Sequence, residues 1–138
     1  MTFNNLNELM KYIENDVQDV LENEVAETVK DDMLVSIHND VYAAYSPEHY
    51  LRRMVNGGFS DRSNLEATVY DGILKVRDVA PLDNGRKDWE LDDIIVHGYG
   101  NQPFARDYIS RTEERLIDTK DHVEAMKKGL KEKGYNFK

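Results

Sequence analysis

The sequence predicts an α+β fold in which a long N-terminal helix and a C-terminal helix pack on a small antiparallel β-sheet, made of a hairpin and one or two further strands. Three observations predict this class. Apolar residues recur at steps of three and four from Leu6 to Val41, two alternating runs flank an Asp-Gly pair, and helical spacing returns near the C-terminus. The 138 residues suit a single domain.

We divide this one domain, residues 1–138, into four segments. Residues 1–45 form the long helix, and residues 46–64 form a connector rich in arginine and glycine. Residues 65–103 hold the hairpin and loops. Residues 104–138 form the C-terminal helix and tail.

The N-terminal helix is defined by an apolar stripe and by the absence of breakers. Asn5 is suited to cap its start, with Glu8 three residues on as in a capping box. No Pro or Gly interrupts residues 5–45, so the helix can exceed about 30 residues, or about 45 Å. A domain of this size cannot cover such a helix, and we expect part of it to pack against another subunit.

The connector contains two adjacent arginines, Arg52 and Arg53, shortly before Gly57-Gly58. Guanidinium groups bind carboxylates in a bidentate manner. Two interpretations are open: the pair grips carboxylates of a neighbouring copy, or it pairs with the acidic first helix of its own chain.

A hairpin follows the connector. Residues 65–70 and 73–79 alternate around Asp71-Gly72, a strong two-residue turn signal. Residues 82–90 are interpreted as a loop, and residues 91–96 as a third strand or a short helix.

The C-terminal helix is predicted to open at Pro103 and to continue through Leu130. Gly134 stands where a helix-ending glycine is expected, after four lysines. Phe104, at the start of this helix, is interpreted as a core residue in preference to a partner contact.

The charge of the chain is uneven. The net charge is −9, yet residues 1–40 hold ten acids and two bases while residues 119–138 hold three acids and six lysines. This distribution suits head-to-tail contact between copies. It equally suits a solvated acidic helix followed by a lysine-rich helix end that complements the helix dipole. The acidic balance disfavours duplex nucleic acid as a bound partner.

No catalytic constellation is found, and we expect no enzyme activity, no cofactor and no metal. The chain has no cysteine, which excludes disulfides and thiolate metal sites. None of the four histidines has an i, i+4 partner, and no P-loop or nucleophile elbow occurs. The adjacent acids Asp31 and Asp32 point apart on a helix and are interpreted as surface charge. No apolar run reaches the roughly 18 residues of a membrane span, so no membrane partner is expected.

The order of the motifs resembles a known family. The chain begins with a long N-terminal helix, which is followed by Tyr50-Leu51-Arg52-Arg53 and then Gly57-Gly58. After these come a hairpin that ends in Ala80-Pro81, a glycine-rich loop that runs into Pro103-Phe104, and a closing helix. Over about residues 5–135 this order is similar to the head–tail joining proteins of long-tailed bacteriophages, also called neck or tail-completion proteins.

The resemblance implies a structural virion protein, made in the host cytoplasm and located in the neck or tail of the particle. It implies a homo-oligomeric ring, of six copies, between the head connector and the tail tube or tail terminator, with phage DNA passing through the channel without specific binding. An acidic channel lining would keep DNA from adhering. The expected inter-subunit or structural anchors are Arg52, Arg53, Phe104, Arg106 and Tyr108.

A second interpretation is a small acidic regulatory or inhibitory protein, antitoxin-like or a nucleic-acid mimic. The acidic first helix supports it. A stable small dimer that captures a basic partner would favour this interpretation over the ring subunit.

Overall fold

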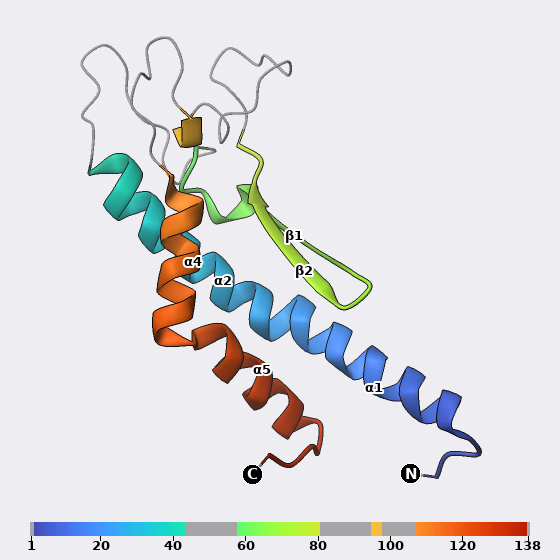
Figure 1. The fold of residues 1–138 in the computed structure, drawn as a ribbon. Helices are drawn as coiled ribbons and strands as arrows, with labels where there is room; N and C mark the ends of the chain where they lie inside the picture. The colour runs from blue at the N-terminus through green and yellow to red at the C-terminus, as the bar shows by residue number, and fades with distance from the viewer. Residues whose placement is uncertain (1, 44–57, 81–94, 98–106, 138) are drawn as a thin grey trace.

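The computed structural model describes residues 2–43, 58–80, 95–97 and 107–137, and shows the mixed helix and sheet architecture that the sequence predicts (Figure 1). One long helical rod runs from the N-terminus. The β-hairpin lies along one side of this rod, and two C-terminal helices lie along another side (Figure 1).

The rod consists of four consecutive helical segments: α1 (Leu6–Val20), the π-helical η1 (Leu21–Val25), α2 (Ala26–Ser36) and the π-helical η2 (Ile37–Tyr42). The predicted N-terminal cap is confirmed, because the Asn5 side chain accepts a hydrogen bond from the Glu8 backbone N–H at 2.9 Å. The helical path therefore extends from Leu6 to Tyr42 without a break.

The two π-helical segments follow from the spacing of the apolar residues. From Val17 to Val41 an apolar residue stands at every fourth position, and nearly all of these side chains are buried or half-buried. On an α-helix of 3.6 residues per turn, each step of four advances by about 40°. A wider turn at η1 and another at η2 absorb this drift, so the stripe stays on one side of the rod.

The hairpin is confirmed as predicted, with strands β1 (Leu65–Tyr70) and β2 (Ile73–Asp78). They pair antiparallel, with Leu65 opposite Asp78 at the base and Tyr70 opposite Ile73 at the tip. Asp71 and Gly72 both have positive φ, at 53° and 74°, as a type I′ turn requires. Just before β1, residues Arg62–Asn64 form the short 3-10 turn η3.

The C-terminal region is two helices, where one continuous helix was predicted. They are α4 (Tyr108–Thr119) and α5 (Asp121–Glu132), separated by Lys120 in the left-handed conformation. The Thr119 hydroxyl bonds to the Arg115 carbonyl and accepts from the Asp121 N–H, so a local side chain replaces the continuing helix ladder. The chain therefore turns at Lys120, and α5 runs back beside the rod (Figure 1).

The predicted end of the last helix is confirmed at Gly134. Its φ is 101°, and the Tyr135 N–H donates to the Leu130 carbonyl while the Gly134 N–H donates to the Lys131 carbonyl. These two bonds are the Schellman motif, which directs Tyr135 back toward the rod.

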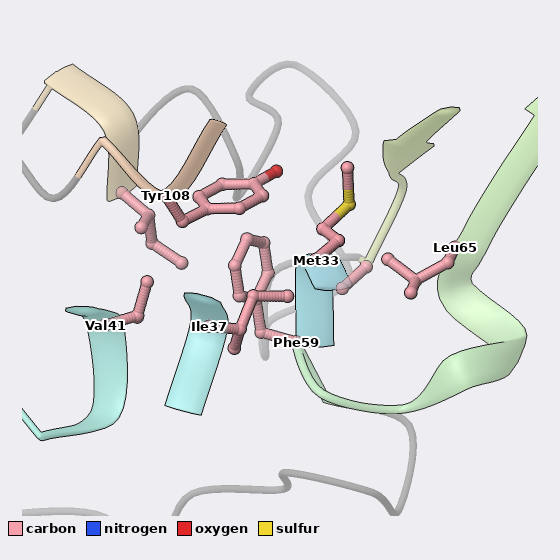
Figure 2. Close-up of a cluster of buried hydrophobic side chains, with 8 residues drawn as sticks. Met33, Ile37, Val41, Phe59, Leu65 and Tyr108 are labelled. Atoms are coloured by element: carbon pink, nitrogen blue, oxygen red, sulfur yellow. The ribbon is translucent and has the colours of Figure 1, made fainter. Parts of the chain in front are cut away.

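Two apolar clusters hold the elements together. The larger joins α2, η2, the turn at Phe59, β1 and α4, and its labelled side chains point toward one another in Figure 2; its buried members are Met33, Ile37, Val41, Phe59, Leu65, Ala80, Ile95 and Tyr108. The smaller joins the middle of the rod to the hairpin and α5 around Val20, Leu21 and Val25.

The remaining predictions on loops and strands are only partly covered. Residues 95–97 are helical, in agreement with the short-helix alternative for residues 91–96 over that stretch. The predicted loop at residues 82–90 lies outside the described residues.

Candidate functional site: an assembly surface

Four of the five expected anchors, Arg52, Arg53, Phe104 and Arg106, lie outside the described residues. The fifth, Tyr108, is fully buried at the start of α4. Its ring meets the Phe59 ring edge-on, with centroids 5.0 Å apart (Figure 2). Its burial agrees with the structural alternative of the two roles expected for Tyr108, an anchor within its own chain.

A different arginine of the connector binds the long helix. Arg62 pairs with Glu27, and its Nη1 lies 2.5 Å from Asp31 Oδ1. The hydrogen bond from Arg62 lowers the pKa of Glu27, and the same contact raises the pKa of Arg62. The intrachain alternative proposed for Arg52 and Arg53 is thus the role that Arg62 plays.

The basic C-terminal end also contacts the acidic helix of its own chain. Lys133 Nζ lies 2.7 Å from Asp19 Oδ2 and 3.7 Å from Asp16 Oδ1. The Tyr135 hydroxyl donates to Asp16 at 2.8 Å. Burial and then the bond to Asp16 raise the pKa of Tyr135 to about 12. Part of the charge complementarity that suggested contact between copies is therefore satisfied inside one chain.

Asp31 and Asp32 have different surroundings although they are adjacent. Asp31 is exposed and pairs with Arg62, as surface charge should. Asp32 is buried, which contradicts the surface-charge interpretation for this residue. Burial raises the pKa of Asp32; the nearby Asp121 carboxylate raises it further, whereas Arg115 opposes the shift.

The N-terminal half of the rod carries an apolar stripe that its own chain covers poorly. Leu6, Met10, Ile13 and Val17 recur at steps of four, three and four, on the face that becomes buried at Val20. Helix α5 covers this face near Val20, since Gly129 lies so close that an added Cβ would stand 2.5 Å from Val20 Cγ1. Past Tyr135, which reaches Asp16, the stripe opens: Leu6 is 71% exposed and Met10 is 48% exposed.

The tip of the hairpin is a second exposed apolar surface. Tyr70 is 84% exposed, and its cross-strand partner Ile73 is also largely exposed. The preceding pair, Val69 and Leu74, points to the other face and packs on the smaller cluster. Sequence reasoning missed this feature. The signal was an apolar pair beside Asp71-Gly72, at positions that the alternation assigns to the solvent face.

Other kinds of site find no support in the part of the chain that the structure describes. There, no three His, Asp or Glu side chains gather in a way that would hold a metal ion. In the same residues, no helix combines the length and the apolar character needed to cross a bilayer. The exposed apolar stripe and tip are therefore the features that carry functional argument.

Comparison with known proteins identifies a family. A family model described as YomN matches residues 5–132, which spans both exposed surfaces. No curated protein and no solved structure matches the chain.

Proposed function

The chain belongs to the YomN family, and we propose that it is a structural virion protein of the phage neck or tail end. In this proposal it acts by assembly: six copies form a ring that completes the tail and joins it to the head connector. Phage DNA passes through the ring without specific binding. The proposal depends on the resemblance in the order of the motifs and on the exposed surfaces of the fold.

The observation that carries the proposal is the uncovered stripe on α1. Leu6 and Met10 are exposed at this end of the helix, and exposed apolar side chains lower the solubility of a protein unless another surface covers them. Subunits of permanent assemblies display such surfaces before they assemble. The expectation that the rod is too long for its own domain is supported by this exposure.

The alternative of an acidic capture protein receives less support. A protein that mimics nucleic acid needs a free acidic face for its basic partner. In this chain Asp16 and Asp19 contact Lys133, and Glu27 and Asp31 contact Arg62. Four of the ten acids in residues 1–40 therefore contact two cations of their own chain, which reduces the free acidic face.

The test uses a phage whose genome encodes this chain. The gene is disrupted and supplied again from a plasmid, and lysates are examined by electron microscopy and by mass spectrometry of purified particles. We expect disruption to leave filled heads and separate tails, and complementation to restore joined particles that contain the chain. Normal particles without the chain would overturn the proposal.

Complementation also tests the two connector arginines. The double variant Arg52→Ala/Arg53→Ala is expected to fold but to leave particles incomplete. Lys127→Ala/Lys128→Ala removes two adjacent cations from an exposed part of α5 and serves as the matched control. Equal yields from the two variants would show that the arginines have no special role.

A further inference from the structure

We propose that the hairpin tip of one copy docks on the uncovered α1 stripe of the next copy. The tip is defined as Tyr70, Asp71, Gly72 and Ile73, and the docking part of the stripe is Leu6, Met10 and Ile13, of which Leu6 and Met10 are exposed and Ile13 is half-buried. This inference rests on the proposed function, because it names the surfaces through which the copies of the ring make contact.

The two surfaces of one chain cannot cover each other. Val69 and Leu74 face the rod and pack there, so Tyr70 and Ile73, one position along each strand, face away from it. The hairpin runs beside the rod with its tip directed toward the N-terminal half (Figure 1). Only a second molecule can bring a tip of this kind onto the face of the stripe.

The shapes and polarity of the two surfaces match. The tip is narrow and projects as a two-residue turn with an apolar pair. The stripe is long and apolar, and two to three helical turns of it extend beyond the point where Tyr135 closes the contact with α5. Burying apolar surface against apolar surface is the main favourable term in association.

The charges beside the two surfaces are complementary. Glu14 lies at the edge of the stripe, about 40° round the helix from Met10, and the long side chain of Lys11 lies further round on the same side, about 100° from Met10. The tip carries exposed Asp71 at the turn and exposed Lys75 on its outer face. Asp71 can meet Lys11 while Lys75 meets Glu14. A contact between two identical tips would instead place Asp71 against Asp71.

A contact between different surfaces of identical chains is head-to-tail. Such contacts repeat from copy to copy and give a closed ring when the rotation closes. Tip and stripe are small beside a standard protein interface. Each contact is therefore weak alone and gains from closure of the ring, where the last contacts form within one assembly.

Disulfide trapping tests the contact in the purified chain, because the native sequence has no cysteine. A Met10→Cys chain and an Ile73→Cys chain, one carrying a mass tag, are mixed at high concentration and mildly oxidised. We expect a mixed disulfide dimer, and a ladder of longer species from the double variant that carries both cysteines. Circular dichroism checks that each variant is folded.

The matched control places the second cysteine at another position of equal exposure, away from the tip. Ile117 on α4 is 69% exposed and Ile73 is 68% exposed. Met10→Cys mixed with Ile117→Cys should give about tenfold less mixed dimer than the tip pair. Equal yields from the two mixtures, no trapping at all, or a dominant dimer between two copies of the Met10→Cys chain would overturn the proposal.

Charge reversal provides the second measurement. Asp71→Lys in the Ile73→Cys chain, or Lys11→Glu in the Met10→Cys chain, should reduce the trapping yield, and mixing the two changed chains should restore it. If the double reversal traps no better than either single change, the assigned orientation is wrong.

The outcomes separate this inference from the proposed function. Particles that contain the chain, together with no trapping between tip and stripe, would reject the inference alone. Trapping only to another virion protein would also reject it, since the stripe would then belong to a different partner. Trapping of purified copies, with the chain absent from particles, would instead reject the neck function.

Discussion

The two ends of the long helix use the same residue types in opposite ways. Around η2 the stripe residues Ile37 and Val41 are buried by α4, the hairpin base and the turn at Phe59. Around the start of α1 the stripe residues Leu6 and Met10 lie largely in solvent. The apolar pattern of the sequence continues from one end of the helix to the other, so the two ends differ in whether other elements of the chain cover them.

The difference teaches that helical periodicity indicates which face seeks burial and leaves open which molecule buries it. At the packed end the hairpin base, α4 and the turn at Phe59 come from the same chain, and α5 covers the middle of the rod. At the open end α5 has already terminated at the Schellman motif around Gly134. The packed end stabilises the fold, and the open end is available for assembly.

The largest expected effect comes from breaking the packed end at Tyr108. Tyr108→Ala removes a fully buried ring that stacks edge-on with Phe59, and large-to-small aromatic changes in cores cost about 3–5 kcal/mol. Denaturant unfolding followed by circular dichroism measures the loss. Ile109→Ala, at a partly exposed neighbour, is the control and should change the free energy of unfolding by much less. Similar losses in both variants would show that the packed end does not depend on Tyr108.

The next effect lies at the seam between the packed and open ends. An added Cβ at Gly129 would stand 2.5 Å from Val20 Cγ1 and 3.1 Å from Glu24 Cγ. Gly129→Val should therefore push α5 from the rod and cost about 1–3 kcal/mol, as overpacking does. Thermal unfolding measures it, with Lys128→Val as the control for placing a branched residue at an exposed position of the same helix. A Gly129→Val chain as stable as this control would contradict the close contact.

The adjacent acids Asp31 and Asp32 sharpen the comparison further, because the same substitution by Asn should change the free energy of unfolding in opposite directions. Asp31→Asn weakens the Arg62 pair on the surface and should lower the free energy of unfolding at pH 7 by less than about 1 kcal/mol. Asp32→Asn removes a buried charge whose pKa is raised and should increase stability at pH 7.

The pH dependence of the free energy of unfolding tests the predicted sign of the Asp32→Asn effect. Because its folded pKa exceeds the unfolded one, the folded state binds the proton more tightly, and its ionisation destabilises the fold as pH rises. The advantage of Asp32→Asn should therefore shrink as the pH falls toward the ordinary value of 3.8, and it should be absent below that value. Denaturant unfolding of both variants at pH 7 and at low pH measures this. Equal losses at pH 7 from both variants would show that burial does not distinguish the two acids.

Much of the secondary structure could be predicted from local sequence. Asn5 as the cap, the Asp71-Gly72 turn and Gly134 as the helix end each depend on one or two residues with a specific backbone preference. The π-helical segments were missed, although the four-residue apolar spacing from Val17 to Val41 contained the signal. The break at Lys120 was missed because no Gly or Pro marks it, and a threonine hydroxyl provides the local alternative.

The candidate assembly surface was less predictable. The excess length of the rod anticipated an uncovered stripe, but which end stays open depends on where α5 stops, and this is set by tertiary packing. Lys133 and Asp16 are far apart in sequence, so their pairing could not be separated from contact between copies. The exposure of Tyr70 and Ile73 likewise depends on which hairpin face meets the rod.

The smallest effect reports on the point where the open end begins. Tyr135 lies against Asp16, and burial together with this hydrogen bond raises the pKa of the phenol to about 12 from the usual 10.0. Absorbance titration of the phenolate should show Tyr135 of the folded chain ionising late, and Tyr135→Phe should reduce the late component by one tyrosine. Asp16→Asn keeps the ring and removes the neighbouring charge, so the late component should move toward lower pH. Since the folded pKa is the higher one, the associated stability is present below about pH 10 and is lost as the pH rises toward 12. A late component of undiminished size in Tyr135→Phe would mean that the C-terminal tail does not close on α1, and the stripe would then be open further along the helix, toward Val17.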